Sequence, residues 1–175
     1  MSRVLMTGNA AAAWGARLAE VDYVPAFPIT PQTEIIESLS AWTDSGEMTG
    51  RRVTLDSEHS MLTAAGAAAA TGIRVFSATS SQGLLYAMEM LYTVSGWRAP
   101  FVLVNVSRGL SAPITLEPDH NDVLAARDSV FPADPLCYLP GGARQRSARL
   151  PPWRGSVGAP AGAGQHGRFL SILHP

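Results

Sequence analysis

Short apolar segments and helix-like segments alternate along the first 129 residues of the chain. The apolar segments predict strands, at residues 22–27, 51–56, 73–80 and 100–108. Helices are predicted between and before them, at residues 9–21, 30–42, 57–72 and 82–96. Because helices alternate with strands, we expect an α/β fold with a parallel sheet and helices on both of its faces.

Residues with capping preferences predict where these helices begin and end. Asn9 and Thr30 are expected as N-caps, with Pro31 in the first helical position, where a missing N–H has no consequence. Ser57 is expected to cap the third helix, and Gly72 to end it.

Polar residues follow each of the four predicted strands, in the segments PITP, DSEH, TSSQG and SRGLSAP. The carboxyl ends of parallel strands lie along one edge of a sheet, where such folds bind their ligands. We therefore expect the functional site at this edge.

Residues 130–175 differ from the rest of the chain. They contain seven of the 13 prolines and five of the 13 arginines, but one of the 14 acidic residues. Neither helical nor strand periodicity continues through most of this segment, which is typical of a disordered, proline-rich tail. The sequence therefore predicts a domain at 1–129 and a distinct tail at 130–175.

Charge and hydropathy exclude several classes of function. A formal net charge of -1 gives no basis for binding nucleic acid or an anionic membrane. The first 20 residues lack the long apolar core of a secretory segment, and AAGAAAATGI is too short and too weakly apolar to span a bilayer. The single cysteine, Cys137, excludes an internal disulfide and an iron–sulfur cluster ligated by this chain alone. We expect a cytoplasmic protein.

Four motifs, in this order along residues 1–129, together resemble one family: FPITPQT, DSEHSMLTAAGAAAATG, ATSSQGLLYAMEMLY and SRGLSAPITLEPDHNDVLAARDS. The chain resembles the N-terminal, pyrimidine-binding domain of 2-oxoacid:ferredoxin oxidoreductase alpha subunits, of the pyruvate type. The resemblance implies a thiamine diphosphate-binding fold, incomplete at its C-terminus. It also implies oxidative decarboxylation of a 2-oxoacid, pyruvate by default, with coenzyme A to acyl-CoA, CO2 and reduced ferredoxin.

The same resemblance implies how the complex is divided. This domain would hold the aminopyrimidine of thiamine diphosphate, while a beta subunit would hold the diphosphate and its Mg²⁺. Iron–sulfur clusters would lie on partner chains, with gamma- and delta-type subunits and ferredoxin as further partners. Two alternatives stay open: a thiamine diphosphate-dependent decarboxylase or carboligase, and an inactive truncated fragment.

Glu58 is the expected catalytic residue. The family's activating carboxyl group hydrogen-bonds the pyrimidine ring and must hold a proton near neutral pH, which needs a dry environment that raises its pKa. The resemblance places Glu58 in this role and as a cofactor ligand. From position alone, the favoured explanation of Glu58 is an acid in the first turn of a helix, and the resemblance reverses this.

The resemblance implies that Thr30 and Arg108 bind the substrate, and arginine suits this role because it binds carboxylates through paired hydrogen bonds. From the residues alone, Thr30 is a helix cap, and Arg108 is equally well explained as a surface arginine paired with an acid. Cofactor contacts are expected from Thr30, Pro28, Ser81 and Gln82, with backbone N–H groups of SSQG free for a ligand. Ser81 is alternatively a cap alone.

No metal site is expected on this chain. Asp119, His120 and Asp122 are interpreted as a loop and a helix start, as is common for such residues. His59 is interpreted as a packing residue, or one that supports Glu58. Three methionines are expected in the core: Met61, Met88 and Met90.

After RDS the family pattern stops, but a one-base shift of the reading frame recovers family-like segments at three places in the right order. We therefore expect that an insertion or deletion near codon 129 placed residues 130–175 out of frame. A domain that has lost its last strands and helix would expose apolar surface and be inactive.

Overall fold

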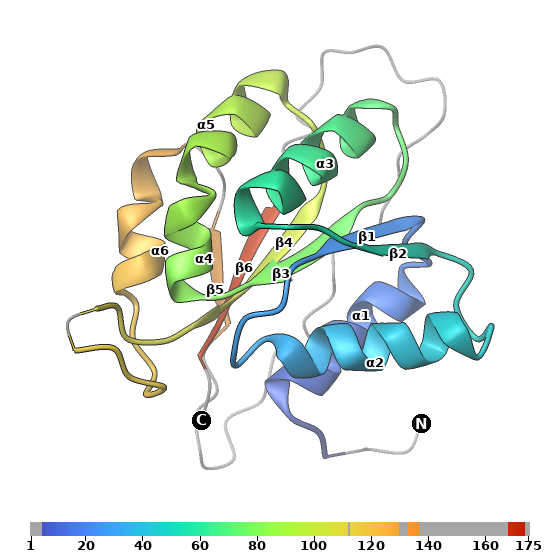
Figure 1. Ribbon diagram of the computed structural model, residues 1–175, viewed down its shortest axis with the longest axis horizontal. Coiled ribbons are helices and arrows are strands. Elements are labelled where there is room, and N and C mark those ends of the chain that lie inside the picture. The colour runs from blue at the N-terminus through green and yellow to red at the C-terminus, as the bar shows by residue number, and fades with distance from the viewer. Residues whose placement is uncertain (1–4, 112, 130–132, 137–167, 174–175) are drawn as a thin grey trace.

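The computed structural model describes residues 5–111, 113–129, 133–136 and 168–173 (Figure 1). In chain order, its elements are α1 (Gly8–Leu18), β1 (Tyr23–Ala26), α2 (Thr33–Asp44), β2 (Arg51–Thr54), α3 (Glu58–Ala70), β3 (Phe76–Thr79), α4 (Ser81–Tyr86), α5 (Met88–Trp97), β4 (Val102–Ser107), α6 (Asn121–Ala125), the 3-10 helix η1 (Arg127–Ser129), β5 (Ala133–Leu136) and β6 (Arg168–Leu173).

The strands are parallel in every described pairing, as predicted. β1 pairs with β2, and the other strands form a sheet in the order β3-β4-β6-β5. A single bridge between Tyr23 and Val75 joins the two groups. The described strands therefore lie side by side in the order β2-β1-β3-β4-β6-β5.

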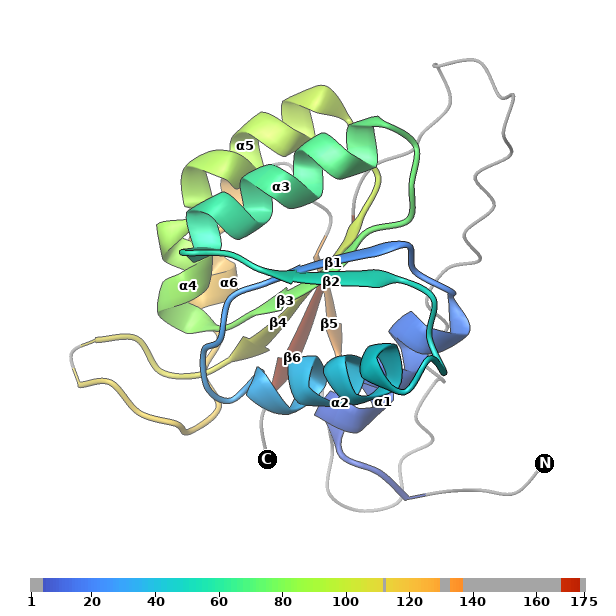
Figure 2. The ribbon, with the colours of Figure 1, turned by 45° about the vertical axis from the view of Figure 1, so that its right-hand side comes forward.

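Helices cover both faces of the strands, which confirms the predicted layers. α1 and α2 lie on one face, and α3, α4, α5 and α6 lie on the other (Figures 1 and 2). β4 is buried on both sides because its residues alternate between two cores. Leu103 packs with the α3 and α5 side, whereas Val102 and Val104 pack with the α1 and α2 side.

Small residues let α3 approach α5 closely. A Cβ on Gly66 would overlap Val94 of α5, so only glycine fits there without rearrangement. Ser57 caps α3 by accepting a hydrogen bond from the Ser60 N–H, and Gly72 follows the helix with φ +89°, as predicted. Of the three methionines expected in the core, Met61 and Met90 are buried and Met88 is partly buried.

Three predicted helix ends are wrong. Thr7 caps α1, while Asn9 lies inside it with a buried side chain. α2 begins at Thr33, so neither Thr30 nor Pro31 belongs to the helix. The single helix predicted at 82–96 is divided at Ala87 into α4 and α5, and α5 runs past Gly96 to Trp97.

The structure also differs from prediction in the segment after residue 129. Strands β5 and β6 form there and pair in parallel, and β6 pairs with β4 over six residues. The prediction that this segment lacks strands is therefore wrong at these two places. Most of the predicted tail, including Cys137, lies outside the described residues.

Candidate functional site at the carboxyl edge of the sheet

Arg108 lies directly after β4 and is only 8% exposed. Its NH1 group donates to Thr30 Oγ1 at 3.1 Å, and its NH2 group donates to Gln82 Oε1 at 3.2 Å. Its Nε is buried without a partner, and no carboxylate of the described residues pairs with it. A buried positive charge with only neutral partners is unfavourable unless an anion binds to it. Arg108 is therefore suited to bind an anionic ligand.

Two side-chain amides hold the loop that carries Thr30. Gln32 is fully buried, and its Nε2 donates to the carbonyl oxygen of Phe27 at 2.8 Å. Asn9 reaches from α1 and donates through Nδ2 to the carbonyl oxygen of Pro31 at 2.9 Å. The backbone is thus fixed on both sides of Thr30, whose hydroxyl accepts from Arg108.

A buried aspartate fixes the start of α4. Asp122 is fully buried, and its Oδ2 accepts from the Ser81 N–H at 3.1 Å and from Asn105 Nδ2 at 2.7 Å. Ser81 has φ 42°, which is unfavourable for a residue with a side chain, and its hydroxyl donates to the carbonyl oxygen of Arg108. The Ser81 N–H is therefore occupied, contrary to the expectation of free N–H groups in SSQG. Asp122 and Ser81 together support the backbone of Arg108.

Glu58 begins α3 and is 7% exposed, so its carboxylate lies in a largely dry environment. A Cβ placed on Gly83 would lie 2.6 Å from Glu58 Oε1 and 2.6 Å from Thr79 Oγ1. Both oxygens therefore lie close to the same point beside α4, and Thr79 Oγ1 is buried with no hydrogen-bond partner in the part of the chain that the structure describes. The missing side chain at Gly83 leaves the space that Glu58 and Thr79 occupy.

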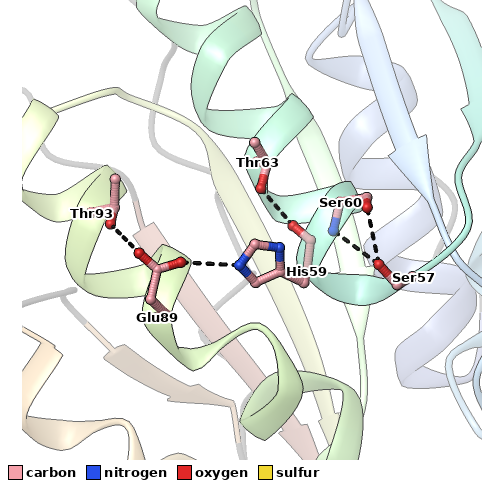
Figure 3. Close-up of polar contacts among 6 residues, drawn as sticks. All are labelled: Ser57, His59, Ser60, Thr63, Glu89 and Thr93. Atoms are coloured by element: carbon pink, nitrogen blue, oxygen red, sulfur yellow. Dashed lines mark hydrogen bonds and ion pairs between the residues drawn. The ribbon is translucent and has the colours of Figure 1, made fainter.

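His59 points toward Glu89 on α5 (Figure 3). Its Nε2 lies 3.0 Å from Glu89 Oε2, and Thr93 donates to Glu89 Oε1. These contacts, with the His59 hydrogen bond as the largest cause, lower the pKa of the exposed Glu89. The Ser60 side chain likewise lowers the pKa of Asp56. His59 thus packs α3 against α5.

Neither a candidate metal site nor a candidate membrane span is present in the described part of the chain. There, no group of three or more His, Cys, Asp or Glu side chains is arranged to hold a metal ion. Asp119 accepts from the Asn121 N–H and α6 begins at Asn121, so EPDHND is a loop and helix start, as predicted. No helix among the described residues is both long and apolar enough to cross a membrane.

The structure brings three predicted site residues into direct contact, Thr30, Gln82 and Arg108. Glu58 packs beside Gly83, the residue after Gln82, whereas Pro28 lies exposed in the loop after β1. Sequence reasoning missed several residues that shape the site: Asn9, Gln32, Thr79, Gly83, Asn105 and Asp122. Two of them, Thr79 and Gly83, could have been found from the sequence, because both belong to the polar segment TSSQG at the end of a predicted strand.

A family model described as "Pyruvate flavodoxin/ferredoxin oxidoreductase, thiamine diP-bdg" matches residues 14–134. The matched region contains every predicted site residue and ends close to the boundary expected at residue 129.

Curated relatives resemble the chain over a stretch of similar length. The chain is 48% identical over 125 residues to pyruvate synthase subunit PorA of Methanocaldococcus jannaschii, covering 71% of this chain and 32% of that protein. It is 45% identical over 125 residues to ketoisovalerate oxidoreductase subunit VorA of Pyrococcus horikoshii, with the same coverage. The chain thus spans about a third of the length of these relatives.

Solved structures resemble the fold. A 2-oxoglutarate:ferredoxin oxidoreductase from Magnetococcus marinus superimposes with a TM-score of 0.66 and 25% identity, over 77% of this chain and 24% of that one. A benzoylformate decarboxylase from Polynucleobacter necessarius gives a TM-score of 0.62 over 97% of this chain and 30% of that one, at 16% identity. The second likeness concerns the fold alone.

Proposed function

The chain belongs to the pyruvate flavodoxin/ferredoxin oxidoreductase family of thiamine diphosphate-binding domains, and from this premise we propose that it forms part of the alpha subunit of a 2-oxoacid:ferredoxin oxidoreductase. The reaction is the oxidative decarboxylation of a 2-oxoacid with coenzyme A to acyl-CoA, CO2 and reduced ferredoxin. Pyruvate is the default substrate, although relatives named for pyruvate and for ketoisovalerate are similarly close.

The observation that carries this proposal is the buried guanidinium of Arg108, which has no carboxylate partner among the described residues. A 2-oxoacid carries a carboxylate, and a guanidinium binds carboxylates through charge-assisted hydrogen bonds. Thr30 and Gln82 hold the guanidinium in place without neutralising it, because both accept hydrogen bonds as uncharged groups. Arg108 and Thr30 thus bind the substrate at the end of the sheet.

The residues around Glu58 fit the aminopyrimidine of thiamine diphosphate. A carboxylate that is 7% exposed and has no salt-bridge partner among the described residues is available to a ring nitrogen. When bound, thiamine diphosphate supplies a nucleophilic carbon and accepts the electron pair that decarboxylation releases. The carboxyl group of Glu58 would hydrogen-bond the ring, and the absence of a side chain at Gly83 leaves room for this group beside Thr79. Further cofactor contacts are proposed from Thr30, Pro28 and Ser81, as the family resemblance implies.

The proposed partner subunits are those that the family resemblance implies. A beta subunit would hold the diphosphate and Mg²⁺, partner chains would carry the iron–sulfur clusters, and gamma- and delta-type subunits and ferredoxin would complete the path of the electrons. The complex would work in the cytoplasm, and the chain alone is expected to be inactive.

Dye reduction by the chain co-expressed with its partner subunits tests the function. Given a 2-oxoacid and coenzyme A, the complex is expected to reduce a viologen dye. Coenzyme A-independent release of an aldehyde would instead indicate a decarboxylase. Complete inactivity with every 2-oxoacid would indicate a fragment that lacks the function.

We further propose that residues 130–175 are out of frame after a one-base change near codon 129. Support comes from the family match, which ends at residue 134. Independent sequencing of the gene is expected to find the extra or missing base, and an unchanged frame in those reads would reject this part of the proposal.

A further inference from the structure

The side-chain amide of Gln82 bonds to Arg108 through its oxygen but not through its NH2 group. Gln82 Oε1 accepts from Arg108 NH2 at 3.2 Å, whereas Gln82 Nε2 is buried and has no hydrogen-bond partner among the described residues. A guanidinium has only donors, so the amide must face Arg108 with its oxygen, and its NH2 group must point elsewhere. A buried donor without a partner is costly, which favours an acceptor from a ligand.

Arg108 has an unused donor as well. Its Nε is buried without a partner, while its two NH groups are oriented by Thr30 and Gln82. Two buried donors on contacting side chains, Arg108 Nε and Gln82 Nε2, therefore lack acceptors within the described part of the chain. A 2-oxoacid can accept hydrogen bonds from both donors, because its carboxylate and its keto group together present three acceptor oxygens.

The geometry of α4 separates Gln82 from the group around Glu58. Successive residues of an α-helix point about 100° apart, so Gln82 and Gly83 face different directions. Gly83 faces Glu58 Oε1 and Thr79 Oγ1, and Gln82 faces Arg108. The proposed function places the cofactor ring beside Glu58. Gln82 faces the other direction, toward Arg108 and the proposed substrate site.

We propose that Gln82 is a residue of the 2-oxoacid site: its Oε1 orients the guanidinium of Arg108, and its Nε2 donates a hydrogen bond to the bound 2-oxoacid. This replaces the sequence-based expectation that Gln82 contacts the cofactor. The inference rests on the proposed function, because it names a residue of that function's substrate site.

The test compares Gln82→Met and Gln82→Glu in the subunit assembled with its partner chains. Met removes the donor and the acceptor at similar length, and Glu keeps the acceptor but places a negative charge against Arg108. We expect the KM for the 2-oxoacid to rise about tenfold in Gln82→Met and more in Gln82→Glu. The KM for coenzyme A and the concentration of thiamine diphosphate needed for half-reconstitution are expected to stay unchanged.

Asn121→Asp is the matched control, since it makes the same change from amide to carboxylate on an exposed residue. It is expected to leave all three constants unchanged. If Gln82→Glu fails to assemble, Gln82→Met decides, because it adds no charge to the buried site.

Two results would overturn the inference. In the first, Gln82→Met assembles and retains the wild-type KM for the 2-oxoacid. In the second, a higher concentration of thiamine diphosphate is needed for half-reconstitution while that KM is unchanged, which would indicate that Gln82 contacts the cofactor. A wild-type complex that turns over no 2-oxoacid would instead refute the proposed function, and the inference with it.

Discussion

Replacing Gly83 by alanine is expected to displace Glu58 and so reduce activity. The new Cβ would lie 2.6 Å from Glu58 Oε1 and from Thr79 Oγ1, and 2.8 Å from Glu58 Cγ. Ordinary contacts begin near 3.4 Å, so the two oxygens must each move by about 0.8 Å, the difference between these distances. Misplacing a reacting group by about 1 Å can lower the rate about 100-fold, so we expect a 10- to 100-fold loss of 2-oxoacid-dependent dye reduction.

Stability is expected to change far less than activity in this variant. Overpacking costs about 1–3 kcal/mol, and alanine in place of glycine returns up to about 1 kcal/mol in a helix. Gly96→Ala in α5 is the matched control, because a Cβ there meets nothing within 4 Å. It should retain full activity and gain slightly in thermal stability. A Gly83→Ala complex with wild-type activity would refute the proposed packing of Glu58 against α4.

Three other substitutions test separate parts of the account. Glu58→Gln is expected to lower 2-oxoacid-dependent dye reduction at least about 100-fold while the complex still assembles, and retained turnover would contradict the catalytic role. Arg108→Ala is expected to raise the KM for the 2-oxoacid about 100-fold and leave that for coenzyme A unchanged; an unaltered dependence on 2-oxoacid would count against it. His59→Ala is expected to raise the pKa of Glu89 toward its ordinary value, as followed by NMR titration. Because the folded pKa of Glu89 is lowered, its contribution to stability is present above the ordinary glutamate pKa and is lost as the pH falls through the lowered value, so the variant should lose less stability over that acidic range. An unmoved Glu89 titration would show that the His59 contact is not formed.

Local patterns predicted the features that depend on neighbouring residues. The alternation of apolar segments and helices identified the parallel sheet, and Ser57 was recognised as a cap because its partner, the Ser60 N–H, lies three residues away. The polar strand ends placed Arg108 at the correct edge, since parallel strands all end on the same side.

Contacts between distant residues could not be predicted in this way. Thr30 was expected as a cap because it precedes a proline and a helix, but its hydroxyl accepts from Arg108, 78 residues along the chain. Asp122 resembled any aspartate at a helix start, and its burial against Ser81 and Asn105 appears only once the sheet is folded. Ala87, where α4 gives way to α5, carries no local signal for a break.

The most direct test is an experimental structure of the assembled complex with thiamine diphosphate bound. We expect a carboxyl oxygen of Glu58 within hydrogen-bonding distance of a pyrimidine ring nitrogen, in a setting closed to solvent. A Glu58 side chain surrounded by water and remote from the ring would contradict this expectation.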